Sequence, residues 1–263
     1  MPRAAVVGER VFAARRRELV RRRRRRFLAG LGVCALVCGV GYGGYRLYRS
    51  SLFELDHISV EGNAAISRQE VIAASGLEGG ENVLSLPLDR ARRRLEAHPW
   101  VARAKVSRMP PSGILITIRE RAPLVALAQS QGVVLVAGDG VVLGPQADRG
   151  RLPEVLVGGL PVEKVTAGDR VNGNLAVANA LAVVAGLDPE VARQVVGVDA
   201  RGVDGLELVL ASGVRVRYGS ADEQERKDRA ILLMLSRAAS EGTALDYLDV
   251  RAPGAPVLRP KSA

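Results

Sequence analysis

Residues 101–123 read VARAKVSRMPPSGILITIRERAP, and two alternating apolar runs within them flank a proline-rich turn. In the second run Ile114, Ile116 and Ile118 recur at every second position, which is the period of a half-buried β-strand. Proline, serine and glycine between the runs are typical turn residues. The stretch therefore predicts a hairpin of two strands, Val101–Arg108 and Ile114–Glu120.

The residues before this hairpin predict one more strand and two short helices. Phe53–Glu61 alternates apolar and polar residues, which indicates a strand ending at Gly62. Ser67–Glu70 has the spacing of a capping box, so a helix should begin there. A second helix carries apolar residues at helical spacing and must end before Pro99. The predicted order is strand-helix-helix-strand-strand.

Two features at the ends of these elements have structural interpretations. Trp100 follows Pro99 at a helix-to-strand junction, where its ring is expected to seal the helix onto the sheet. Glu120 and Arg121 lie at the end of the last strand and are expected to form a surface or hinge ion pair.

The same residues resemble a POTRA domain of the FtsQ/DivIB cell-division family. The family patterns I-x-V-x-G-N, P-W-V, V-x-R-x-P and I-x-V-x-E-R-x-P are matched in order by Ile58–Asn63, Pro99–Val101, Val106–Pro110 and Ile116–Pro123. The resemblance implies an α+β protein with one N-terminal transmembrane helix, a small POTRA domain and a larger mixed β-sheet domain with packed helices. The implied boundaries are 1–26 for a cytoplasmic tail, 27–48 for the membrane helix, 53–122 for the POTRA domain, 123–252 for the β domain and 253–263 for a C-terminal tail.

A charge-free segment of nineteen residues, Phe27–Tyr45, precedes the small domain. A helix of that length, at about 1.5 Å per residue, nearly matches a bilayer core about 30 Å thick. Tyr42, Tyr45 and Tyr48 occupy the place of an interfacial aromatic belt. A cleaved signal peptide is the alternative, but its apolar region would be shorter and a small-x-small cleavage site would follow.

The net charge of +10 is concentrated before this segment, because residues 1–26 carry +9 and the remainder +1. The basic block Arg21–Arg26 therefore predicts a cytoplasmic N-terminus and a body outside the cytoplasm. The family resemblance implies that the membrane is the bacterial inner membrane. Nucleic-acid binding is the alternative for such a block. Its position next to the apolar segment favours anionic lipid as the partner, so no nucleic acid is expected.

Within the apolar segment Ala35, Gly39 and Gly43 recur every four residues. Small residues at this spacing allow close approach of a second helix, so these three are candidate helix-packing residues. Cys34 and Cys38 are the only cysteines, so no disulfide is expected in the body.

The second half of the chain predicts a mixed α/β region. Gly138–Gly140 separates two short strands as a hairpin turn, and Ser220–Glu223 is expected to cap a long helix running from Asp222 to about Ser240. Residues 152–159 are expected to form a loop. Further predictions are a helix over 172–186 and strands over 195–199, 206–210, 214–218 and 247–251.

No motif for catalysis, metal or cofactor binding occurs in the sequence, so the expected protein is not an enzyme and needs no cofactor or metal. A carboxylate-only site would require two acids facing each other across a cleft, and the sequence alone does not exclude one. The candidates for it are Asp199, Asp204, Asp246 and Asp249.

The resemblance implies a divisome scaffold that binds the FtsB–FtsL pair at the division septum and controls septal wall synthesis. In the family the partner binds along the C-terminal strand and the residues after it. The corresponding partner-binding residues here are Tyr247, Asp249, Arg251, Ala252 and Gly254. Pro253 and Pro256 follow that strand and cannot donate ladder hydrogen bonds, which argues against strand pairing through 253–257. The alternatives are a POTRA-containing export factor and a membrane-tethered wall hydrolase.

Overall fold

The computed structural model describes residues 30–146 and 150–261, and the chain divides into two compact units. The first unit contains the described residues up to Ile58 together with Glu78–Leu86 and Arg108–Ile114. The second unit contains the rest. The predicted basic tail 1–26 and the first three residues of the predicted membrane helix lie outside the described residues.

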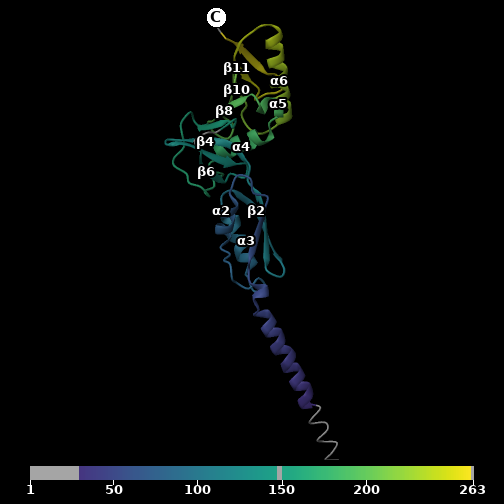
Figure 1. Cartoon of the computed structure of the whole chain (residues 1–263). Helices are drawn as coiled ribbons and strands as arrows, with labels where there is room; N and C mark the ends of the chain where they lie inside the picture. The colour runs from purple at the N-terminus through teal and green to yellow at the C-terminus, as the bar shows by residue number, and fades with distance from the viewer. Residues whose placement is uncertain (1–29, 147–149, 262–263) are drawn as a thin grey trace, which may run out of the picture. The chain divides into compact units, whose positions relative to one another are not determined.

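The first unit begins with a helix over residues 30–48 (Figure 1). The side chains of this helix are all exposed. Between residues 30 and 146 and between 150 and 261, no helix combines the length and the hydropathy needed to cross a bilayer. Ala35, Gly39 and Gly43 lie on this helix, and a Cβ atom at either glycine would meet nothing within 4 Å. Helix pairing through these residues stays a prediction.

A hydrogen-bond network holds the remainder of the first unit together. The 3-10 helix η1, Ser51–Phe53, is followed by an extended segment that bonds to 78–86, with Val83 N–H donating to Phe53 O at 2.8 Å. The Arg108 guanidinium donates to the carbonyls of Val83 and Leu86 at 2.8 and 2.9 Å. The predicted strand over 53–61 is therefore too long, because its first residues form η1 and a loop.

The three-stranded sheet has the order β1-β3-β2, and its elements follow the predicted order strand-helix-helix-strand-strand. Ser67 caps its helix as predicted, since its hydroxyl accepts the N–H of Glu70 at 3.1 Å. The bounds are β1 His57–Glu61, α2 Arg68–Ser75, α3 Leu88–Ala97, β2 Val101–Met109 and β3 Gly113–Glu120.

The expected ion pair between Glu120 and Arg121 is wrong, because each side chain has other partners. The Glu120 carboxylate accepts three consecutive backbone N–H groups, those of Ala64, Ala65 and Ile66, at 2.8–3.0 Å. Burial raises the pKa of Glu120, but these three bonds outweigh it and hold the pKa below its usual value. Arg121 instead pairs with Asp139.

Replacing Glu120 by alanine should lower the free energy of unfolding by about 2–3 kcal/mol, because three N–H groups lose a charged acceptor. The lowered pKa stabilises the fold above the ordinary glutamate pKa, and this stabilisation disappears as the pH falls through the folded-state value. Urea unfolding at pH 7 and at pH 3 measures both effects. Glu120→Gln keeps one acceptor oxygen and should be intermediate at pH 7. Equal stability of Glu120→Ala and the native chain at pH 7 would contradict this account.

The second unit contains a mixed nine-stranded sheet of order β12-β11-β10-β9-β8-β7-β4-β5-β6 (Figure 1). Three pairs are parallel, β4 with β7, β7 with β8 and β10 with β11, and the others are antiparallel. The strands are β4 Pro123–Gln129, β5 Gly132–Ala137, β6 Val142–Gln146, β7 Glu154–Val157, β8 Val195–Ala200, β9 Leu206–Leu210, β10 Arg215–Arg217, β11 Leu245–Asp249 and β12 Val257–Pro260.

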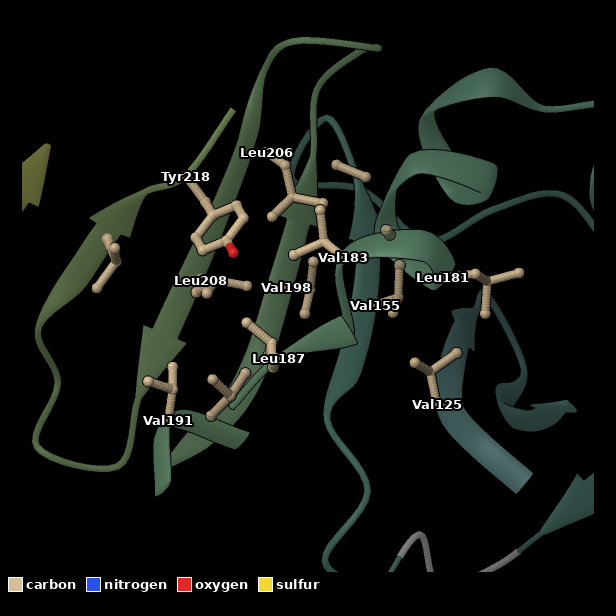
Figure 2. Close-up of a cluster of buried hydrophobic side chains, with 14 of the residues drawn as sticks. Val125, Val155, Leu181, Val183, Leu187, Val191, Val198, Leu206, Leu208 and Tyr218 are labelled. Atoms are coloured by element: carbon tan, nitrogen blue, oxygen red, sulfur yellow. The ribbon is translucent and has the colours of Figure 1, made fainter. Parts of the chain in front are cut away.

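The main core lies where helices pack on this sheet. The helices are α4 Leu175–Gly186, α5 Pro189–Ala192 and α6 Gln224–Ser240. Figure 2 shows Val183 of α4 and Val191 of α5 beside the sheet residues Val155 and Leu208, all of them buried. A smaller cluster contains Ala126, Leu135, Ala137 and Leu143, and Trp100 packs against it. Trp100 therefore packs against the large sheet, and its expected contact with the preceding helix stays a prediction.

Three predictions for the second half are corrected by the structure. Residues 154–157 form the strand β7 instead of a loop. The predicted cap at Ser220 is absent, because α6 begins at Gln224 after Glu223 in a left-handed conformation (φ 52°), while the Ser220 hydroxyl bonds to Asp222. The terminal strand covers 245–249, and the predicted tail contains the further strand β12.

Candidate partner-binding edge of the large sheet

The last two strands form an antiparallel hairpin at one end of the large sheet. Tyr247 lies opposite Arg259, and Asp249 lies opposite Val257. The connecting loop turns at 252–255, where Ala255 N–H donates to the carbonyl of Ala252 at 3.0 Å. Pro253 and Pro256 therefore lie in the loop before β12 and do not interrupt the strand.

Tyr247 lies between two arginine side chains. The Arg217 and Arg259 guanidinium carbons are 4.8 and 4.7 Å from the centre of the Tyr247 ring, within the range of cation–π attraction. A bulge between Leu245 and Tyr247 adds one residue to β11 here. Asp246 bonds to the same Arg259 side chain. The ring is thus held in place by strands on both sides of β11.

Asp249 holds the start of the hairpin loop. Its carboxylate accepts the Arg251 backbone N–H at 3.1 Å and the Arg251 guanidinium at Nε and Nη2. The hydrogen bonds from Arg251 outweigh partial burial and lower the pKa of Asp249, so the carboxylate is charged at neutral pH. Ala252 and Gly254 are exposed in the loop that follows.

The five partner-binding candidates predicted from the sequence thus lie partly on β11 and partly in the loop after it. Tyr247 and Asp249 are two residues apart on β11 and share one face of the sheet. Arg251, Ala252 and Gly254 lie in the loop. Sequence reasoning missed Arg217 and Arg259, which contact Tyr247, and it missed β12 altogether.

The edge strand of this hairpin is β12, whose four residues are all exposed. Lys261 N–H donates to Ala244 O at 2.8 Å, so the backbone of this position faces β11. Because backbone direction alternates along an antiparallel strand, Arg259 and Val257 also face β11, and Leu258 directs its N–H and C=O groups away from the sheet. Leu258 thus offers a donor and an acceptor to an incoming strand.

The opposite edge of the sheet, β6, is covered by the chain itself. Gly168 N–H donates to Val142 O at 2.8 Å, and Val142 N–H donates to Asp169 O at 2.9 Å. Val171 N–H further donates to Gly140 O, at 2.9 Å. The loop before α4 thus occupies the backbone groups that β6 would otherwise offer at its start.

Three of the four acidic candidates for a carboxylate site are engaged in ion pairs, and the fourth, Asp204, is exposed. Asp199 bonds to Arg201 at 2.7 Å, Asp246 to Arg259, and Asp249 to Arg251. In the part of the chain that the structure describes, no group of three or more His, Cys, Asp or Glu residues is placed to hold a metal ion.

Comparison with known proteins gives two family matches in succession. The family model "POTRA domain, FtsQ-type" matches residues 53–121, and "Cell division protein FtsQ/DivIB, C-terminal" matches residues 126–251. Similar proteins named "Cell division protein FtsQ" include those of Myxococcus fulvus, 31% identical over 85% of this chain and 82% of that protein, and Geobacter sp., 28% identical over 84% and 82%. The Mycobacterium leprae protein of that name is 29% identical over 83% of this chain and 60% of its own length.

Proposed function

The chain belongs to the FtsQ/DivIB family of cell division proteins, and from this premise we propose that it is a non-catalytic scaffold of the bacterial divisome that binds the FtsB–FtsL pair. It acts at the division septum, where it links early and late division proteins and controls septal wall synthesis. The open edge of β12 is the observation that carries the partner-binding proposal.

We propose that the partner adds a strand along β12. Strand addition to a sheet edge supplies main-chain hydrogen bonds, and side chains on the neighbouring faces give specificity. Leu258 provides outward backbone groups, and β6 at the other edge is partly occupied by residues 168–171. Tyr247 and Asp249 would then lie on β11, separated from the added strand by β12, while Arg251, Ala252 and Gly254 would contact the partner at the loop.

We propose that the body is anchored in the cytoplasmic membrane with its N-terminus inside. The charge-free segment Phe27–Tyr45 and the basic block Arg21–Arg26 support this orientation. Anionic headgroups are the proposed partners of the basic block, and Ala35, Gly39 and Gly43 the proposed surface for helix pairing within the membrane.

Leu258→Pro tests the strand-addition proposal. Proline removes an N–H that faces away from β11, so the hairpin is retained while the partner loses a donor. We expect affinity for the purified FtsB–FtsL pair, measured by titration calorimetry, to fall by about tenfold, since one hydrogen bond is worth about 1 kcal/mol or more.

Leu258→Ala is the matched control, because it shortens the same side chain and keeps the N–H. It should bind within about threefold of the native chain. Equal affinities for Leu258→Pro and Leu258→Ala would place the partner away from this edge.

A further inference from the structure

Proline occupies one of the two outward-facing positions of the edge strand β12. Alternate residues of an antiparallel strand face the same way, and Lys261 N–H bonds to Ala244 O at 2.8 Å, so Leu258 and Pro260 direct their backbone groups away from β11. Proline has no N–H, and within sheets it is confined to edge positions of this kind. Within β12, which the structure describes throughout, the outward side therefore offers one donor, at Leu258, and two acceptors, the carbonyls of Leu258 and Pro260.

An antiparallel strand from a different chain can use all three of these groups. A residue opposite Leu258 exchanges two hydrogen bonds with it, and a residue opposite Pro260 donates its N–H to the Pro260 carbonyl. The incoming residue opposite Pro260 must therefore have a free N–H, because a proline there would remove the third bond. The edge fits a strand of ordinary residues at these two places.

A second copy of β12 can use fewer of the groups. Two-fold pairing of matching edges sets β12 antiparallel to itself, and two registers overlap three residues of each strand. With Leu258 opposite Leu258 of the other copy, these two residues exchange two bonds, while Pro260 lies opposite Pro256 and neither proline has an N–H. With Leu258 opposite Pro260, each Leu258 donates one bond and receives none. Self-pairing thus yields two bonds in either register, against three for a foreign strand.

Side-chain charge acts in the same direction. In the second register Arg259 lies opposite Arg259 of the other copy, and like charges directly opposite each other destabilise a sheet. The Arg259 side chain is 63% exposed, and its ion pair with Asp246 offsets part of the repulsion. The backbone groups therefore carry the larger part of the preference against a second copy.

We infer that Pro260 makes β12 selective for a strand of a different chain, one with a free N–H opposite Pro260, over β12 of a second copy. Edge prolines protect sheets against unwanted edge-to-edge pairing, and here the neighbouring Leu258 leaves the edge open to a suitable strand. The selectivity against a second copy depends on this chain alone, whereas the fit to the FtsB–FtsL pair rests on the proposed function.

Pro260→Ala tests the inference on the full chain in detergent. Alanine supplies the missing outward N–H and leaves the bond from Lys261 N–H to Ala244 O in place. Self-pairing then gains one hydrogen bond for each copy. We expect the self-association constant, measured by sedimentation equilibrium, to rise about 25-fold, which corresponds to two bonds of about 1 kcal/mol each. The apolar N-terminal segment is the same in both proteins, so association through it cancels in the comparison.

Second substitutions at Leu258 show whether the gain comes from this edge. Pro260→Ala combined with Leu258→Pro again has a single outward N–H and should return to the association of the native chain. Pro260→Ala combined with Leu258→Ala keeps both N–H groups and should keep the gain. Self-association of Pro260→Ala within about twofold of the native value would overturn the inference, and so would a gain that Leu258→Pro leaves unchanged.

Titration calorimetry with the FtsB–FtsL pair, below the concentration at which the variant self-associates, separates this inference from the proposed function. A pair that adds its strand across both outward positions should bind Pro260→Ala about fivefold more tightly, because a partner carbonyl gains a donor. Unchanged affinity, together with the loss expected for Leu258→Pro, would overturn the fit at Pro260 and leave the proposed contact standing. Equal affinities for Leu258→Pro and Leu258→Ala would overturn the proposed contact, while increased self-association of Pro260→Ala would still support selectivity against a second copy.

Discussion

Replacing Asp228 by alanine is expected to lower the free energy of unfolding by about 3–5 kcal/mol, because it breaks a buried polar network at the start of α6. Asp228 is 3% exposed, and its two carboxylate oxygens accept the Tyr218 hydroxyl at 2.9 Å and the Asp188 backbone N–H at 2.7 Å. Alanine leaves both donors without an acceptor. Thermal unfolding should show a midpoint roughly 10 °C lower, at about 2–4 °C per kcal/mol.

The network also contains Lys227, which is 3% exposed and donates from Nζ to Ser220 O at 3.0 Å. Burial lowers the pKa of Lys227 and raises that of Asp228, and burial together with the Asp228 charge raises that of Tyr218. Tyr218 therefore stays protonated and donates its hydrogen bond. Together these side chains connect α6 to β10 and to the loop before α5.

Two variants separate the network from simple loss of volume. Asp228→Asn keeps an oxygen that accepts the Asp188 N–H, and its amide N–H can donate to the Tyr218 oxygen. It should therefore lower the free energy of unfolding by only about 1–2 kcal/mol. Tyr218→Phe removes one hydroxyl and keeps the ring, with a loss of similar size. If Asp228→Asn were as damaging as Asp228→Ala, the hydrogen bonds would not be the cause.

Replacing Arg121 by alanine is expected to lower the free energy of unfolding by about 2–4 kcal/mol, because one guanidinium donates hydrogen bonds to three acceptors. Nη1 donates to the carbonyls of Pro99 and Val101 at 2.8 and 2.6 Å, and Nε donates to Asp139 at 2.8 Å. The Arg121 side chain is only 12% exposed, so water replaces these bonds poorly. Burial raises the pKa of Asp139, but the bond from Arg121, the Val141 N–H and the charges of Arg121 and Arg170 together outweigh it and lower the pKa.

Arg121→Lys is the control for this prediction. Lysine keeps the charge but lacks the planar fork, so one ammonium cannot reach all three acceptors in the same geometry. Its unfolding free energy, from urea denaturation, should fall between those of the native chain and Arg121→Ala. Native stability in Arg121→Lys would show that charge alone is sufficient.

The small domain was predictable because its signals are local. The alternation around Ile116 and the proline turn before it predict the hairpin within two residues, and Ser67 predicts the start of α2. The strand β7 has only four residues and is defined by its parallel neighbours β4 and β8, which are distant in sequence. No local pattern distinguishes such a strand from a loop.

The candidate site also combines residues with a local sequence signal and residues that only distant contacts bring together. Tyr247 and Asp249 follow from a family resemblance that depends on a short terminal motif. Arg217 reaches Tyr247 only because β10 and β11 pair in parallel on either side of α6, a contact between distant residues. The strand β12 is exposed along its whole length, so it lacks the buried face that gives a strand its alternation.

The loop at residues 168–171 bears on how strand addition at this sheet would end. It occupies the start of β6, whereas β12 is exposed at all four of its residues. Two copies that joined by pairing β12 with itself would close a dimer and leave no strand of that edge for a third. Strand addition at β12 would therefore stop at that dimer instead of growing into a filament.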